Sequence, residues 1–195
     1  MTVSAEVKLK VLLLDADASR AAGVRGSLRA LGYEVVGSIA SGARLYMEVA
    51  RLNPDVVIID VNSPDRDTLE HLCCLSRDAP RPVVMFAHDD DKAKIRAAIQ
   101  AGVSAYVVRG LSADRIQPIV EVAIARFEEH RSLRAEIAAV RARLDERKLV
   151  ERAKGVVMQR NGCSENEAYC TLRQLAMTQQ QSLGDVARAL LAGQG

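Results

Sequence analysis

The chain has 195 residues, of which 49% are apolar, and a formal net charge of +2 at pH 7. This is enough for one or two globular domains, and the small net charge excludes a protein that coats nucleic acid through a uniformly basic surface. The first ten residues lack the apolar core of a signal peptide, no run approaches membrane-spanning length, and the four cysteines lack zinc-site spacing. We therefore expect a soluble cytoplasmic protein with reduced thiols and no membrane association.

Residues 8–112 alternate short apolar runs with helical patterns. Runs of this kind, separated by helices, are typical of parallel strands that are covered on both faces. The pattern predicts an α/β fold with a doubly wound, five-stranded parallel sheet. The five apolar runs are VLLL (11–14), VV (35–36), VVII (56–59), VVMF (83–86) and AYVV (105–108).

Four of these runs end at residues that suggest a site. Asp15 and Asp60 follow the first and third runs, whereas Ala87 and Arg109 follow the last two. Because the carboxyl ends of parallel strands meet at one edge of a sheet, we expect these residues to lie close together there. Two converging carboxylates predict a Mg²⁺ site, since hard cations prefer oxygen ligands. The alternative is that acids merely end strands in loops.

Residues 1–126, from about Lys8 onward, resemble the receiver domain of two-component response regulators. The resemblance is carried by VLLLD, DVVIIDVNSPDRDTLEHL, RPVVMF and AGVSAYVVRGL. It implies a flavodoxin-like sheet and places Asp60 at the phosphoacceptor position. The implied Mg²⁺ ligands are Asp15, Asp60 and the backbone carbonyl of Asn62, and the implied switch positions are Ala87, Tyr106 and Arg109.

Several positions depart from the receiver pattern. Ala16 stands where a second adjacent acid is usual, and the next acid is Asp17. Ala87 lacks the hydroxyl that normally bonds the phosphoryl group, and Arg109 replaces the usual lysine. Loss of a hydroxyl donor and of a metal ligand weakens the stabilisation of an acyl phosphate. We therefore expect a protein-docking platform rather than a phosphorylation switch.

A long helical pattern follows the receiver-like segment. No proline or glycine occurs from Val120 to Lys154, so one uninterrupted helix of roughly 35 residues is expected. Apolar or small residues recur at alternating three- and four-residue spacings, as in a coiled coil. We predict a coiled-coil linker over residues 127–146 and a homodimer, with a lone solvated connector as the alternative. The predicted seam consists of Ile119, Ala123, Leu133, Ile137, Val140 and Leu144.

Residues 147–195 contain three short helical patterns. The first stops at Gly162, and the segment from Ser164 to Glu167 predicts a capping box at the start of the second. A helix-turn-helix DNA reader is disfavoured, because the third pattern, LGDVARALLAG, offers only Asp185 and Arg188 as polar side chains. The pattern predicts a small three-helix domain.

This C-terminal segment resembles the ANTAR RNA-binding domain through AKGVVMQRNGCSENEAY, LRQLAM and LGDVA. The order receiver, coil, ANTAR is similar to the transcription antiterminators of the AmiR and NasT type. Segments such as SPDRDTLEHL and RIQPIVEVAIARFE look most like the NasT members, which serve nitrate and nitrite assimilation.

The resemblance implies a regulator without enzymatic activity. Such a protein binds paired stem-loops in a leader mRNA, prevents a terminator hairpin, and is held inactive by a nitrate- or nitrite-sensing inhibitor protein. Arg152 and Lys154 could neutralise phosphates, Arg173 could bond a base edge, and Gly155 would allow close approach. The RNA-binding candidates are Arg152, Lys154, Gly155, Gln159, Arg160 and Arg173.

Two alternatives from other functional classes remain. The first is a phosphorylation-activated response regulator that acts on DNA, for which acyl phosphate on Asp60 and a large gain in activity would be the signature. The second is a protein-interaction adaptor, which would show no salt-dependent affinity for nucleic acid.

Overall fold

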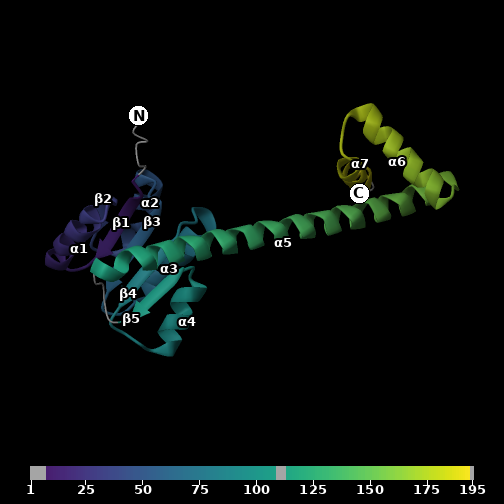
Figure 1. Cartoon of the computed structure of the whole chain (residues 1–195). Helices are drawn as coiled ribbons and strands as arrows, with labels where there is room; N and C mark the ends of the chain where they lie inside the picture. Colours follow the sequence, from purple (N-terminus) through teal and green to yellow (C-terminus); the bar gives the residue numbers. More distant parts are fainter. Residues whose placement is uncertain (1–7, 109–112, 194–195) are drawn as a thin grey trace, which may run out of the picture. The chain divides into compact units, whose positions relative to one another are not determined.

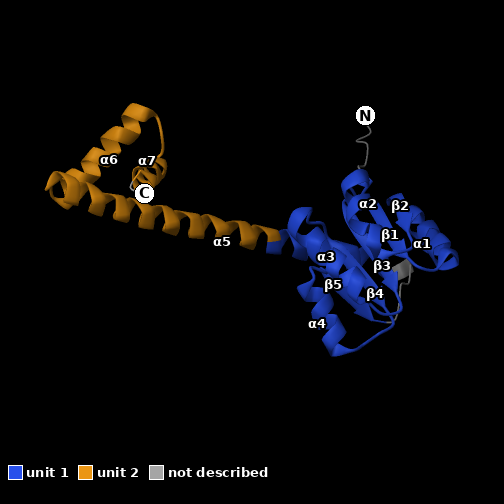
Figure 2. Cartoon of the chain, turned by 180° about the vertical axis from the view of Figure 1, so that it is seen from behind, with its two compact units in different colours: residues 1–130 blue, residues 131–195 orange. Residues whose placement is uncertain are grey.

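The computed structural model describes residues 8–108 and 113–193 (Figure 1). The chain divides into two compact units, a receiver unit (residues 1–130) and a C-terminal unit (residues 131–195) (Figure 2). Each unit has an apolar core of its own.

Five parallel strands form the sheet of the receiver unit, in the order β2-β1-β3-β4-β5. The apolar residues of β1, β3 and β4 are buried on both faces, because these strands lie inside the sheet and helices cover it on either side. The prediction of a doubly wound, five-stranded parallel sheet is confirmed. The strands are β1 (Lys10–Asp15), β2 (Glu34–Ile39), β3 (Val56–Val61), β4 (Val83–Ala87) and β5 (Ala105–Val108).

Two layers of helices enclose this sheet (Figure 1). Leu28 of α1 packs on one face together with Ile116 and Val120 of α5. Leu45 of α2 and Leu72 of α3 pack on the opposite face, where α4 also contributes to the core. The helices are α1 (Ala18–Ala30), the short 3-10 helix η1 (Gly42–Arg44), α2 (Leu45–Leu52), α3 (Arg66–Asp78), α4 (Lys92–Gln100) and α5 (Ala113–Asn161).

Helix α5 is a single helix of 49 residues, which confirms the expected long helix and extends it at both ends. Ala123 is fully buried in the receiver core, every residue from 128 to 148 is exposed, and Val150 is buried in the C-terminal core. The predicted dimer seam is wrong at Ile119 and Ala123, which pack in the receiver core. A core-facing stripe and a coil seam share the same helical period, so the sequence pattern does not separate them. Within the described ranges, neither α5 nor any other helix is long and apolar enough to cross a bilayer.

The C-terminal unit packs the end of α5 against α6 (Glu165–Gln179) and α7 (Leu183–Ala192). The Ser164 hydroxyl accepts from the backbone N–H of Glu167, whose carboxylate accepts from the N–H of Ser164, so the predicted capping box is confirmed. A Cβ on Gly184 would lie 2.7 Å from Oε1 of Glu146, so α7 approaches α5 through a glycine. The core consists of Val150, Ala153, Val157, Ala168, Leu172, Ala176, Val186 and Ala187.

Candidate functional site

The two predicted acidic residues lie side by side at the edge of the sheet. Asp15 ends β1 and is in register with Asp60 of β3. Asp15 is 3% exposed and Asp60 is 2% exposed. Two buried carboxylates at adjacent positions lose hydration and repel each other, so the ionised pair requires a positive partner.

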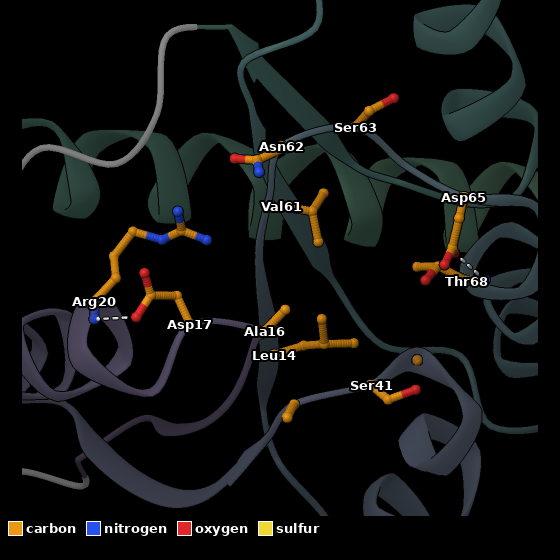
Figure 3. A pocket seen from close by; sticks show the side chains of 12 residues that line it. Leu14, Ala16, Asp17, Arg20, Ser41, Val61, Asn62, Ser63, Asp65 and Thr68 are labelled. Atoms are coloured by element: carbon orange, nitrogen blue, oxygen red, sulfur yellow. Dashed lines mark hydrogen bonds between the residues drawn. The ribbon is translucent and has the colours of Figure 1, made fainter.

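Arg20, in the first turn of α1, supplies that positive charge. Its Nη2 donates to Oδ1 of Asp15 at 2.8 Å, and its Nε lies 3.1 Å from Oδ2 of both Asp15 and Asp60. The Asp17 carboxylate caps α1 by accepting the backbone N–H groups of Ser19 and Arg20. Figure 3 shows the bond from Arg20. Arg20 is absent from the residues predicted for the site, and its only signal in the sequence is an arginine five positions after a strand-ending acid.

Burial governs the protonation of Asp60. Loss of hydration raises the pKa of Asp60 above its ordinary value; the Arg20 guanidinium opposes this rise, and the charge of Asp15 adds to it. The hydrogen bond to Asp15 raises the pKa of Arg20, which keeps the guanidinium charged. Oδ1 of Asp60 has no hydrogen-bond partner among the residues that the structure describes. Oδ2 of the phosphoacceptor candidate therefore forms an ion pair with Arg20, whereas Oδ1 has no partner in the described part of the chain.

The residues predicted to bind Mg²⁺ do not fit a cation in this arrangement. Arg20 lies between the Asp15 and Asp60 carboxylates, and Asp17 uses its own carboxylate to cap α1. The backbone carbonyl of Asn62 accepts two N–H groups from the segment after β4, at 3.1 and 3.2 Å. Over residues 8–108 and 113–193, no three acidic, histidine or cysteine side chains gather as a metal site.

A cavity of about 370 Å³ is lined by Arg20 and by residues that follow β1 and β3, such as Ala16 and Asn62 (Figure 3). Asp65 in its wall caps α3 by accepting the N–H of Thr68, so that carboxylate is already engaged. The Arg20 side chain remains 32% exposed. Solvent and small solutes therefore reach the guanidinium through this cavity. Its polar lining includes Asp17, Arg20, Ser41, Asn62, Ser63 and Asp65.

Of the three predicted switch positions, Tyr106 takes part in a hydrogen-bond network with Asp89 and Lys94. The Tyr106 hydroxyl donates to the backbone carbonyl of Asp89 at 3.0 Å. Lys94 donates to the Asp89 carboxylate at 2.6 Å and, with neighbouring backbone and hydroxyl donors, lowers the pKa of Asp89 to about 2. Ala87 is fully buried at the end of β4 and offers no hydroxyl to this network. Arg109 lies outside the described residues.

Five of the six RNA-binding candidates are exposed on the C-terminal unit. Arg152, Gly155, Gln159 and Arg160 lie on the last turns of α5, and Arg173 lies on α6. In the described part of the chain, and apart from the adjacent residues and backbone of its own helix, no atom would lie within 4 Å of a Cβ at Gly155. A glycine inside a helix costs roughly 0.5–1 kcal/mol relative to alanine. Packing within the unit does not explain this glycine, whereas close approach of a partner would.

Lys154, the sixth candidate, is held within the unit. Its side chain is 10% exposed, and its Nζ lies 2.8 Å from Oε2 of Glu151 and 2.6 Å from Oε1 of Glu165. These two carboxylates raise the pKa of Lys154. The ammonium group joins α5 to the start of α6, so an RNA phosphate would have to compete with both partners.

Helix α6 exposes a residue that the predicted set did not include. Tyr169 is 43% exposed and lies one turn before Arg173, while Met177, one turn after it, is 72% exposed. Residues four apart share one face of a helix, so the ring and the guanidinium are neighbours on the surface. Tyr169 is the one aromatic residue of the C-terminal unit, a signal that was present in the sequence.

The remaining seam positions lie in the exposed part of α5. Their spacing of four, three and four residues places them on a single stripe, as in a coiled coil. Each is about half exposed: Leu133 50%, Ile137 51%, Val140 49% and Leu144 52%.

Two protein families match the sequence. Residues 11–121 match the response regulator receiver domain, and residues 138–191 match the ANTAR domain. The first match spans more than half of the chain, and the strand order and paired acids agree with it. The chain therefore belongs to the response regulators in which a receiver domain precedes an ANTAR domain, a type of RNA-binding antitermination regulator.

The chain is 33% identical over 188 residues to the transcriptional regulatory protein PdtaR of Mycobacterium tuberculosis, covering 96% of this chain and 91% of that protein. It is 41% identical over 63 residues to the nitrate regulatory protein of Klebsiella oxytoca, covering 32% of this chain and 16% of that protein. A receiver domain of a modulated diguanylate cyclase from Desulfovibrio desulfuricans matches with a TM-score of 0.55 at 22% identity, covering 63% of this chain and 98% of that one, and supports the fold alone. The receiver and ANTAR assignments are confirmed, and the similarity to a nitrate regulator is confined to about a third of the chain.

Proposed function

We propose that this protein binds a leader mRNA through two stem-loops and prevents formation of a terminator hairpin, so that transcription continues into the genes downstream. The ANTAR match supports RNA binding as the output. The observation that carries the proposal is the exposed pair formed by Tyr169 and Arg173 on one face of α6. An aromatic ring beside a guanidinium is a combination that recognises unpaired bases and the adjoining phosphates.

The proposed contact surface extends from α6 to the last turns of α5 within the same unit. Tyr169 would stack on an unpaired loop base, while Arg173 would bond a base edge or a phosphate. Arg152 and Arg160 would neutralise phosphates, and the open surface at Gly155 would allow the RNA backbone to approach. Gln159 adds a neutral donor and acceptor on the same part of α5.

Lys154 takes a different role in this proposal. Because its two carboxylate partners hold it against α6, we assign it to the positioning of α6 relative to α5 rather than to direct contact with RNA. Its predicted RNA contact is therefore kept only as an outcome that a Lys154 variant can test.

The exposed stripe of α5 supports a homodimer. Half-exposed apolar residues at coiled-coil spacing gain stability when a second copy covers them. In this proposal residues 127–146 form the dimer linker between a receiver domain (1–126) and an ANTAR domain (147–195). Two linked ANTAR domains would then bind two loops with a gain in avidity.

The receiver domain is proposed to be a docking platform for a ligand-sensing inhibitor protein. Ala87 and the Arg20-bridged acids argue against an efficient phosphorylation switch. Nitrate or nitrite as the sensed ligand, with assimilation genes as the target, rests on the similarity to a nitrate regulatory protein and on the NasT-like segments. The alternative is a kinase that phosphorylates Asp60 with Mg²⁺. A small phosphodonor that modified Asp60 and strongly increased RNA affinity would favour that alternative.

Binding to designed RNAs tests the output. Hairpins selected by the full-length protein from a random-loop pool would be rebuilt as one-loop and two-loop RNAs of equal length. We expect the two-loop RNA to bind about tenfold tighter or more, because the second contact is intramolecular. Equal affinities would remove the case for recognition by a dimer, and equal affinity for duplex DNA of the same sequence would remove the case for an RNA regulator.

Single substitutions test the proposed surface. Arg173→Ala and Tyr169→Ala should each weaken binding about tenfold, since one guanidinium contact or one stacked base is worth roughly 1–3 kcal/mol. Arg131→Ala is the matched control, because it removes one positive charge from an exposed position outside the seam. Wild-type affinity in a folded Arg173→Ala protein, with circular dichroism unchanged, would exclude the assignment.

A further inference from the structure

The acidic site of the receiver domain contains a cation that belongs to the chain itself. Receiver domains typically bind Mg²⁺ at this site, whereas here a guanidinium lies between the two carboxylates. We propose that Arg20 takes the place of the divalent cation, so that the Asp15–Asp60 pair is neutralised within the protein and has little affinity for Mg²⁺.

The hydrogen bonds of the cluster leave few oxygen atoms for a metal. Oδ1 of Asp15 accepts from Arg20 and from the backbone N–H of Asp17, both at 2.8 Å, and Oδ2 of Asp15 accepts from Arg20 at 3.1 Å. Oδ2 of Asp60 lies 3.1 Å from the same guanidinium. Of the four carboxylate oxygens, only Oδ1 of Asp60 has no partner in the described ranges. A single free oxygen is a poor start for a cation that requires about six oxygen ligands.

The residues around the pair do not supply the missing ligands. Asp17 points its carboxylate at the N-terminal N–H groups of α1, and the side chain of Ala16 has no ligand atom. The backbone carbonyl of Asn62 already accepts two N–H groups. A cation would therefore have to break an N-terminal cap or a strand-end hydrogen bond as well as displace Arg20.

Charge and position both favour the arginine over the metal. A guanidinium stays protonated at any ordinary pH, and its planar group can donate in parallel to two carboxylates. The side chain is delivered by the first turn of α1, whose cap holds the backbone of Arg20 in place. A divalent cation brought between the same acids would also be repelled by that fixed charge. Removing the guanidinium should therefore create a cation site from two acids that otherwise lack a partner.

A metal titration of the full-length chain tests this. Mn²⁺ binding, followed by calorimetry and by the paramagnetic resonance of free Mn²⁺, is compared between wild type and Arg20→Gln, which removes the charge and keeps most of the volume. Arg20→Gln should bind Mn²⁺ about tenfold more tightly or better, because a unit charge a few ångströms away is removed. Mg²⁺ should raise the Tm of Arg20→Gln by several degrees and leave that of wild type almost unchanged.

Three further variants make the outcome decisive. Arg29→Gln removes an exposed charge from the same helix and should bind Mn²⁺ like wild type. Asp15→Asn added to Arg20→Gln should abolish the gain, because one of the two acids is gone. Arg20→Lys retains a cation and should stay insensitive to Mg²⁺. The proposal is overturned if wild type binds Mn²⁺ as tightly as Arg20→Gln does. If Arg20→Gln does not fold in either condition, tight Mn²⁺ binding by wild type or by Arg20→Lys would still overturn it.

Discussion

Arg20 in the receiver domain and Lys154 in the ANTAR domain each hold two carboxylates, but burial is reversed between the two clusters. Around Arg20 the acids are buried, with side-chain exposures of 0% for Asp15 and 2% for Asp60, while the arginine is 32% exposed. Around Lys154 the lysine is 10% exposed, while Glu151 and Glu165 are 55% and 66% exposed. Both clusters join one positive side chain to two carboxylates, but the carboxylates are buried in the receiver and the positive side chain is buried in the ANTAR domain.

This reversal determines how much Arg20 and Lys154 each contribute to the stability of their domains. If Arg20 is removed, two buried carboxylates lose their partner and cannot regain water without opening the sheet edge. If Lys154 is removed, its carboxylates are already in water and lose only a weak surface attraction. The stability of the receiver should thus depend strongly on Arg20, whereas the stability of the ANTAR domain should depend only slightly on Lys154.

The largest expected effect is that of Arg20→Ala in metal-free buffer. We expect it to lower the free energy of unfolding of the receiver by about 2–4 kcal/mol, somewhat less than the roughly 3–5 kcal/mol lost when a fully buried pair is broken, because Arg20 is partly exposed. Hydrogen exchange of the β1 and β3 amides measures this, and the α6 amides of the same molecules serve as an internal control. Unchanged protection in β1 and β3 would mean that the buried acids do not need the charge of Arg20 for stability.

A smaller change of opposite sign is expected for Asp60→Asn. Burial is the chief reason that the folded-state pKa of Asp60 is raised above the ordinary value of 3.8. Ionisation of this residue therefore opposes folding as the pH rises above 3.8. Asparagine removes this cost and leaves Arg20 paired with Asp15. At neutral pH the Tm of the receiver should rise by a few degrees. The gain should shrink as the pH falls through the raised pKa and wild-type Asp60 becomes protonated.

The exposed variant Asp90→Asn, which removes one acid without touching the pair, should leave the Tm nearly unchanged. A lower Tm for Asp60→Asn at neutral pH would show that the ion pair with Arg20 outweighs the cost of burying Asp60. The difference in stability between the two clusters would then come from charge attraction rather than from the loss of hydration.

The parts of this molecule that could be predicted from sequence depend on local pattern. Unbroken apolar runs identify β1, β3 and β4, because both faces of a central parallel strand are buried. The capping box of α6 is contained within four consecutive residues, from Ser164 to Glu167. The acid pair follows from strand order, since Asp15 and Asp60 end neighbouring strands.

The parts that could not be predicted depend on how far a side chain reaches. Nothing in the helical period of α1 indicates that Arg20 turns back onto the acids of two strands. Lys154 meets Glu165, eleven positions later and on another helix, so its burial is a tertiary effect. Ala123 has the period of a coil seam but packs against the receiver, because a repeat identifies a stripe and not its partner.

The smallest effect expected within the comparison is that of Lys154→Met, which keeps an apolar chain in the buried position and removes the charge. The Tm of the C-terminal unit should change by no more than a few degrees, far less per charge than in the receiver. Lys154 lowers the pKa of Glu165, so its contribution is present above the ordinary pKa of 4.5 and is lost as the pH falls through the lowered value. Lys154→Met should therefore also flatten the acid side of the stability profile of this unit.

RNA affinity separates the two readings of the same variant. If Lys154 only packs α6 against α5, a role that the apolar chain of methionine retains, RNA binding by Lys154→Met should stay within about twofold of wild type. A phosphate contact would instead cost about tenfold and lower the salt dependence of binding by close to one ion. The matched comparison is Arg152→Ala, which removes an exposed positive charge two residues earlier on α5 and should show the tenfold loss. If Lys154→Met remains folded but loses affinity as Arg152→Ala does, Lys154 contacts RNA directly. Its exposed carboxylate partners, Glu151 and Glu165, would then be displaced by an RNA phosphate.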